Sequence, residues 1–342
     1  MERLPTRENA NGSPVTIAGF YQAGRERLGL TLAAGEGNMD RIIGEPIVNR
    51  PGLALTGFYE HFAYKRVQLI GKAEMAYMKS LDDATRLQRL KAMSDRKAYC
   101  FVYTNGQKPR EDEKALAGEM GAVLLMSPMR TRDFAAQCAF VLQRLAAPST
   151  TIYGTMVEVA GLGVLFEGDP GLGKSETALG LIKRGCALIS DDLTCIRKEV
   201  ANDALFGSAS AATAGYMEIR GIGIMHIPSI FGVNAVRAEK RLQLVVTLKR
   251  LQDVRGEIDR IGQTRRVKRI LGVDVPNVII PVSEGRDLVN LVEVAAQQQK
   301  LFTYGVDPVD ALSERLHARA DRFSAERNNL RKKNKTGEKR NG

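Results

Sequence analysis

"EGDPGLGKSETALGLIKRGCALISDD", residues 167–192, decides the fold, because it joins a glycine-rich loop to two adjacent aspartates through one short helix and one short strand. The pattern G-x-x-x-x-G-K-[ST] is complete within it, at Gly168, Gly173, Lys174 and Ser175. The apolar run 163–166 predicts a buried strand before the loop, and the spacing of apolar residues predicts a helix over 176–184 after it. Strand, loop and helix in this order are the context in which the pattern binds phosphate groups.

The chemistry of this loop follows from its residue types. Glycines let backbone N–H groups turn towards phosphate oxygens, and the N-terminus of the following helix adds its positive dipole. Lys174 can reach the outer phosphates, and the Ser175 hydroxyl suits magnesium. An ordinary glycine turn before a helix is the alternative, and the complete pattern in its proper context disfavours it. The predicted binding loop comprises Gly168, Asp169, Pro170, Gly171, Leu172, Gly173, Lys174 and Ser175.

The aspartate pair follows the loop closely, beginning seventeen residues after Lys174. Gly185 ends the predicted helix and 186–189 predicts a buried strand, so Asp191 and Asp192 lie at the C-terminal end of a strand. Ligands bind at this end in open α/β sheets. One carboxylate could help to hold magnesium while the other takes the proton from an attacking hydroxyl. A solvated Asp-Asp turn is the alternative, which the position beside the loop disfavours.

The composition is that of a globular protein of two domains, with 342 residues, 44% of them hydrophobic and 26% charged. No apolar run approaches the roughly 18–20 residues of a membrane span. The polar N-terminus lacks the apolar segment of a signal peptide. No C-x-x-C spacing occurs, and we expect buried free thiols in a reducing cytoplasm. The cysteines are Cys100, Cys138, Cys186 and Cys195.

Much of the net charge of +11 is local. Residues 327–342 hold seven Lys or Arg and one Glu, which is 7 − 1 = +6. With few apolar residues, this basic tail is expected to be disordered. A basic tail can touch nucleic acid or membrane phosphates, but most such tails are only solvated ends, so we do not expect nucleic acid as a partner.

The chain divides into four predicted parts: a polar segment 1–16, an α/β domain 17–148, a catalytic domain 152–312, and a C-terminal helix with the basic tail over 313–342. Strands and helices alternate in the first domain. The short stretch 147–151 has the composition of a linker. Strands are predicted at 66–71, 98–104 and 122–127, and helices at 80–93 and 132–147.

Within the catalytic domain, small residues from 208 to 215 predict a mobile loop, which the stretch "MEIRGIGIMH", 217–226, follows. In this stretch Glu218 and Arg220 alternate with apolar residues, as on one face of a strand. They could form an exposed ion pair on a half-buried strand. Alternatively, they supply a second metal carboxylate and a phosphate-binding cation.

Two turns complete the set of candidate segments. "DRIGQTRR", 259–266, predicts a basic turn, and "PVSEGRD", 281–287, a turn before a long helix over 288–302. Judged alone, Arg260 and Arg286 are ordinary surface arginines.

With these residues in view, the sequence closely resembles the bacterial HPr kinase/phosphorylase family. The resemblance covers nearly the whole chain apart from the first dozen residues and the basic tail. It rests on the phosphate-binding loop and on several separate stretches in the same order: "NRPGLALTGFYEHFAYKRVQLIGKAEMAYM", "SDD", "EIRGIGI", "FGVNAVR", "DRIG" and "PVSEGR". It implies an N-terminal α/β domain and a P-loop kinase domain whose core resembles phosphoenolpyruvate carboxykinase.

The resemblance implies an activity and its partners. The family phosphorylates a serine of the phosphocarrier protein HPr with ATP and Mg²⁺, and removes the phosphoryl group with phosphate as nucleophile, releasing pyrophosphate. It forms hexamers. The loop 168–175 would bind ATP, with Lys174 on the phosphates and Ser175 on magnesium. Asp191 would be the general base of phosphorylation and the acid of the reverse reaction.

The resemblance also gives roles to residues outside the loop. Glu218 would help to bind the metal, and Arg260 would stabilise the transferring phosphate. The segment 217–226 would serve both activities, and 281–286 dephosphorylation. The residues taken from these two segments, besides Glu218, are Met217, Arg220, Gly221, Gly223, His226, Pro281, Gly285 and Arg286.

One position departs from the family pattern. The family has a catalytic histidine in an H-G pair just before the strand that leads into the loop, and Tyr153-Gly154 stands here. Histidine residues occur only at positions 61, 226 and 317, and His61, in an aromatic cluster, is expected to pack there. A tyrosine does not change charge near neutral pH. The phosphorylase direction is therefore in question.

Two other functions remain open. The same chemistry could phosphorylate a small hydroxylated molecule, although "EIRGIGI" and "PVSEGR" favour the protein substrate. A nucleotide-binding regulator that uses its tail on DNA is the other alternative. The presence of Lys174, Ser175 and Asp191 argues against an inactive enzyme.

Overall fold

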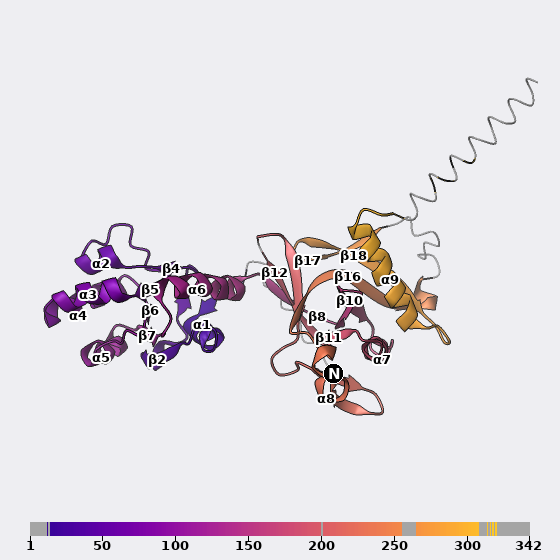
Figure 1. Ribbon diagram of the computed structural model, residues 1–342, viewed down its shortest axis with the longest axis horizontal. Helices are drawn as coiled ribbons and strands as arrows, with labels where there is room; N and C mark the ends of the chain where they lie inside the picture. The colour runs from indigo at the N-terminus through magenta and orange to yellow at the C-terminus, as the bar shows by residue number, and fades with distance from the viewer. Residues whose placement is uncertain are drawn as a thin grey trace, which may run out of the picture. The chain divides into compact units, whose positions relative to one another are not determined.

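The computed structural model describes residues 12, 14–199, 201–254 and 265–307, together with 313, 315, 317 and 319. The chain divides into two compact units, and the N-terminal one ends at Ser149. Each unit has its own sheet and helices (Figure 1). The predicted α/β class with two domains is confirmed. Arg260, most of the 259–266 turn, the first eleven residues and the basic tail lie outside the described residues.

The N-terminal unit is built on a five-stranded sheet with the strand order β2-β7-β6-β5-β4. Strands β4 to β7 run parallel, and β2 joins antiparallel. Central strands such as Val67–Ile70 are buried throughout, because helices cover both faces. The strands are β2 (Thr31–Ala34), β4 (Val48–Asn49), β5 (Val67–Ile70), β6 (Cys100–Tyr103) and β7 (Val123–Met126).

Two apolar clusters fill the spaces between this sheet and its helices. One lies under α1 and α6, and the other under α2 to α5 (Figure 1). A two-stranded ribbon of β1 (Val15–Thr16) and β3 (Ile42–Ile43) adds to the first. The helices are α1 (Ile17–Gly24), α2 (Gly52–Thr56), α3 (Lys72–Ser80), α4 (Asp83–Asp95), α5 (Glu111–Glu119) and α6 (Thr131–Ala146).

The predicted elements of this unit occur with shifted ends. The predicted helix 80–93 begins only at Asp83, because Asp82 caps it by accepting a hydrogen bond from the Thr85 N–H, at 2.9 Å. Ser80 ends the preceding helix α3 instead. The linker predicted at 147–151 is wrong in part, since Ser149–Tyr153 form strand β8 of the second unit.

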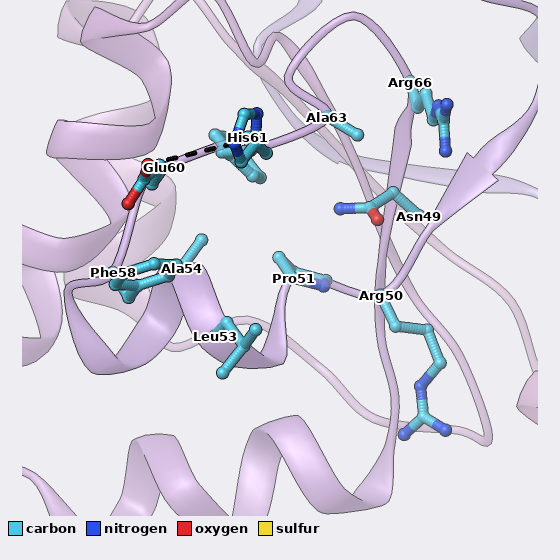
Figure 2. Close-up of a pocket in the computed structure, with 11 residues that line it drawn as sticks. Asn49, Arg50, Pro51, Leu53, Ala54, Phe58, Glu60, His61, Ala63 and Arg66 are labelled. Carbon is cyan, nitrogen blue, oxygen red and sulfur yellow. Dashed lines mark ion pairs between the residues drawn. The ribbon is translucent and has the colours of Figure 1, made fainter.

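The N-terminal unit contains an open pocket of about 290 Å³ between α2 and the loop that follows it (Figure 2). His61 lies at this pocket, and the expectation that it packs in an aromatic cluster is wrong. Its side chain is 93% exposed and its backbone has φ 57°, in the left-handed region. The two arginines of the pocket are paired with carboxylates, Arg50 with Glu74 and Arg66 with Glu45.

The C-terminal unit contains a nine-stranded sheet with the order β11-β9-β10-β16-β13-β12-β8, and β18 and β17 branch from β16. β10, β16 and β18 are parallel, and β9 runs antiparallel to both β10 and β11. The C-terminal ends of β10 and β11 therefore lie at the same end of the sheet. The strands are β8 (Ser149–Tyr153), β9 (Thr155–Val159), β10 (Leu162–Gly168), β11 (Ala187–Ser190), β12 (Leu193–Glu199), β13 (Ala204–Ser208), β16 (Glu239–Arg250), β17 (Arg266–Ile270) and β18 (Val273–Val282).

Helices α7 (Lys174–Lys183) and α9 (Leu288–Thr303) cover one face of this sheet (Figure 1). Ala178, Leu181 and Ile182 of α7 are buried, as the sequence predicts. Alternate residues of β10 point to opposite faces, so Phe166 packs under the helices while Leu165 belongs to the cluster on the other face.

The stretch 217–226 is not one strand. It forms a hairpin of β14 (Tyr216–Ile219) and β15 (Gly223–His226), followed by the short helix α8 (Ile227–Phe231). Gly221 and Gly223 have φ of 81° and 99°, a backbone that glycine adopts without strain, and they turn the chain back. The predicted alternation holds within β14, where Met217 is buried and Glu218 exposed.

The four cysteines are free, and the prediction that all are buried holds for two of them. Cys100 and Cys138 are buried, whereas Cys186 and Cys195 keep partial solvent contact. Burial raises the pKa of the Cys100 thiol far above its usual range and that of Cys138 to about 12. No helix in the described part of the chain combines the length and the apolar character needed to cross a membrane.

Candidate active site

The glycine-rich loop lies between the end of β10 and the start of α7. Gly168, Gly171 and Gly173 have φ of 145°, 84° and 83°, which other residues rarely adopt. At Gly168 a side chain is also excluded sterically, since a Cβ would lie 2.5 Å from the Leu248 carbonyl oxygen. The loop thus exposes its backbone next to the positive N-terminus of helix α7, and this arrangement suits the binding of a phosphate group.

Two cations adjoin the loop. Lys174 Nζ donates to the carbonyl oxygens of Gly168, at 2.9 Å, and Asp169, at 3.1 Å, so the ammonium lies against the loop backbone. The Arg220 guanidinium reaches the loop from the β14–β15 turn: a Cβ added to Gly171 would lie 3.4 Å from its Nη1. Both positive charges are available to phosphate oxygens bound in the loop.

Asp191 stands at the centre of the hydrogen bonds beside the loop and is 8% exposed. Its Oδ1 accepts from Ser175 Oγ at 2.9 Å and from Thr155 Oγ1 at 2.8 Å. Its Oδ2 accepts from the backbone N–H of Glu218 at 3.1 Å. One carboxylate therefore joins the loop helix, the strand β9 and the hairpin.

Asp192 is exposed and lies in a left-handed backbone conformation, with φ 57°. Its carbonyl oxygen accepts a hydrogen bond from the Gly154 N–H at 2.9 Å, which ties the turn to the segment before β9. Although the residue as a whole is exposed, partial burial of its carboxyl raises the pKa of Asp192, together with the negative charges of Asp191 and Glu218, and Lys174 opposes this.

The donor set fits a hard cation that keeps part of its water shell. In the described residues no three His, Cys, Asp or Glu side chains converge to form a protein-only metal site. Magnesium does not need one, because it is usually bound through one or two protein oxygens plus phosphate oxygens and water. Ser175 and the exposed carboxylate of Glu218, whose backbone N–H is bonded to Asp191, are the protein oxygens offered here.

Four of the predicted residues that the structure describes make no hydrogen bond to this cluster, namely His226, Pro281, Gly285 and Arg286. His226 Nδ1 bonds with Ser229 Oγ at 2.6 Å, and its ring lies 4.8 Å from that of Tyr216. Pro281 belongs to β18, while Gly285 and the exposed Arg286 lie in the turn before α9. Tyr153 ends β8, directly before Gly154, and is 40% exposed.

Thr155 is the residue of this cluster that sequence reasoning missed. A threonine at the start of an apolar strand is typical of β-structure and carries no catalytic signal. Its partner is 36 positions further along the chain. Its place next to Tyr153-Gly154, where the family resemblance implies a histidine, is the one sequence feature that could have drawn attention to it.

Comparison with known proteins matches both units to one family. The model of the HPr serine kinase N-terminus matches residues 15–142, and that of the HPr serine kinase C-terminal domain matches 144–316. An HPr kinase/phosphorylase of Leptospira biflexa is 37% identical over 309 residues, which are 89% of this chain and 94% of the relative. One of Caldicellulosiruptor bescii is 38% identical over 283 residues, 83% and 90% of the two chains.

A solved structure of the Hpr(Ser) kinase/phosphatase of Coxiella burnetii also matches, with a TM-score of 0.43 and 32% identity, over 49% of this chain and 98% of that one. The family models and the relatives agree across both units, so the chain belongs to the HPr kinase/phosphorylase family.

Proposed function

We propose that this protein phosphorylates a serine of the phosphocarrier protein HPr with ATP and Mg²⁺, and removes the phosphoryl group by phosphorolysis. Its relatives carry the name HPr kinase/phosphorylase. The observation that carries the proposal is the convergence of Ser175, Asp191 and the Glu218 backbone beside a complete phosphate-binding loop. The loop that would bind the phosphoryl donor and the carboxylate that would act as base for the acceptor hydroxyl thus lie side by side.

In the kinase direction the serine hydroxyl oxygen attacks the γ-phosphorus, and the bond from that phosphorus to the bridging oxygen of ADP breaks. Asp191 takes the proton of the serine hydroxyl. Lys174 and Arg220, both beside the loop, balance negative charge on the phosphates. A magnesium ion held by Ser175 and Glu218, with phosphate oxygens and water, would supply further charge neutralisation.

In the reverse direction a phosphate oxygen attacks the phosphorus of phosphoserine, and the bond to the serine oxygen breaks. Protonated Asp191 delivers its proton to that oxygen, and pyrophosphate leaves. The same carboxylate therefore works from opposite protonation states in the two directions. Arg260 and 281–286 are proposed to assist by family resemblance, and a homo-hexamer is proposed on the same ground.

The proposal is tested by incubating the full chain with HPr, ATP and magnesium and locating the phosphate by mass spectrometry. Phosphorylation of one serine is expected. Lys174→Ala should lower the rate about 100- to 1000-fold, the loss typical of one oriented group at a reacting phosphate. A small-molecule kinase would instead leave HPr unmodified. Activity of Lys174→Ala near that of the wild type would contradict the proposal.

A further inference from the structure

Thr155 is a buried hydroxyl in direct contact with the carboxylate to which we assign proton transfer. We propose that Thr155 is a positioning residue, whose hydrogen bond turns Asp191 so that Oδ2 is the oxygen that exchanges the proton with the substrate serine. The inference rests on the proposed function and adds to it the orientation of the base.

The contact has little freedom to shift. Thr155 is fully buried at the start of β9, paired in register with Phe166 of β10. Gly154, directly before it, is held to the aspartate turn on both sides: its N–H donates to Asp192 O at 2.9 Å, and its carbonyl accepts from Thr194 Oγ1 at 2.8 Å. The Thr155 hydroxyl therefore lies on a strand whose start is hydrogen-bonded to the segment that contains Asp191.

The hydrogen bonds that Asp191 already accepts show which of its two carboxylate oxygens can accept one more from a substrate. Each carboxylate oxygen accepts about two hydrogen bonds. Oδ1 already receives two, from Thr155 and Ser175. Among the described residues, Oδ2 receives one hydrogen bond, from the Glu218 N–H, which leaves one acceptor position. A substrate hydroxyl that gives its proton to Asp191 therefore meets Oδ2.

Thr155 has a task that Ser175 cannot perform alone. The Ser175 oxygen is also the proposed magnesium ligand, so its position must follow the metal and the phosphates. Thr155 is buried on strand β9, is not a proposed ligand of magnesium, and donates its hydrogen bond to Oδ1 from the sheet. Without it, Oδ1 would depend on Ser175 alone, and rotation of the carboxylate would place Oδ2 wrongly for proton transfer.

The test compares Thr155→Val, which removes the hydroxyl, with Thr155→Ser, which keeps it, by kcat and KM for ATP and for HPr in the kinase direction. Thr155→Val should lower kcat about 10- to 100-fold, as for one hydrogen bond to a charged group, and leave KM for ATP within about threefold. Thr155→Ser should keep kcat within about fivefold of the wild type. Because a purely structural role would not separate kcat from KM, this split is the readout.

Several results would overturn the inference while leaving the proposed function intact. The first is a Thr155→Val variant with the kcat of the wild type, and the second is a Thr155→Ser variant that loses as much kcat as Thr155→Val. The third is a Thr155→Val substitution that lowers activity by the same factor in an Asp191→Asn background as in the wild type. If Thr155→Val does not fold by circular dichroism, Thr155→Ala must meet the same expectations. A wild type that fails to phosphorylate HPr would instead overturn the proposed function itself.

Discussion

Asp192 combines a strained backbone with a carboxyl close to two other negative charges. Its raised pKa means that the folded state holds the proton more tightly than the unfolded chain. The contribution of this carboxyl to the free energy of unfolding is greatest below the ordinary carboxyl pKa of about 4. It is lost as pH rises through the pKa that the group has in the folded state.

We therefore expect Asp192→Asn to raise the melting temperature at pH 8, with a gain that shrinks as pH falls. The gain should stay below about 1 kcal/mol, because the side chain is exposed. Asparagine tolerates the left-handed backbone, and Asp192→Ala, which does not, is the control. A lower melting temperature for Asp192→Asn at pH 8 would contradict the assignment.

Tyr153 lies where the family resemblance implies a histidine, and the Gly154 that follows it is hydrogen-bonded to the aspartate turn. A histidine there would change charge near pH 6.5 and could help to protonate Asp191 or the attacking phosphate. Dephosphorylation needs a protonated Asp191, so we expect a phosphorylase weaker than the kinase. Tyr153→His should raise pyrophosphate release from phosphoserine-HPr below about pH 7, and superimposable pH profiles in wild type and variant would contradict this.

At the residue scale, sequence reasoning reached only part of the site. The sequence alone indicates the chemistry of the side chains of Lys174, Ser175 and Asp191. These residues are close together in the sequence, so their proximity in the fold could also be predicted. Thr155 contributes through one bond to a residue 36 positions away, which depends on the antiparallel pairing of β9 with β10 and β11. Pairing between distant strands leaves no local pattern.

At the scale of elements, the predictions failed where one pattern fits two structures. Alternating polarity in 217–226 is typical of a strand and equally of two strands joined by a turn, and only Gly221 and Gly223 indicated the turn. Ser149 and Thr150 have a loop-like composition, yet they become strand because β12 lies beside them. The helices α4 and α6 were found because 3.6-residue periodicity is local.

Helices α4 and α5 are joined by a buried ionic contact. Arg86, 1% exposed, lies 3.1 Å by its Nε from the equally buried Glu113, and it also pairs with Asp83 and Asp112. Glu113 further accepts a hydrogen bond from the Tyr103 hydroxyl at 2.9 Å. Burial raises the pKa of the Glu113 carboxyl, so its charge is costly without a partner.

We expect Arg86→Met to lower the free energy of unfolding by about 3–5 kcal/mol, measured by urea unfolding followed by circular dichroism. The matched control is Arg132→Met. Arg132 pairs with Asp133 on the surface, with 91% of its side chain exposed, so its loss should cost less than about 1 kcal/mol. Equal losses in the two variants would refute the importance of the buried contact.

At the scale of the whole molecule, the reactivity of the four cysteines measures how well each is buried in the folded protein. Cys100 and Cys138 are buried in the N-terminal unit, with raised pKa values that disfavour the reactive thiolate. In the native protein at pH 8 we expect a thiol reagent to modify neither within an hour, while all four react in guanidinium chloride. Peptide mass spectrometry identifies the sites, and native modification of Cys138 would contradict the packing described.

Strand β8 has a practical consequence for dividing the molecule. A fragment that begins at residue 152, where composition places the second domain, keeps two of the five residues of β8, so β12 loses one of its two neighbouring strands. β8 is itself the edge strand of this sheet, and its loss leaves the longer strand β12 at the edge, where it can pair with strands of other molecules. This fragment should therefore aggregate more than one that begins at residue 144, as measured by light scattering. The start of the second unit is thus defined by the pairing of β8 with β12, and a truncated gene has to keep residues 149–153.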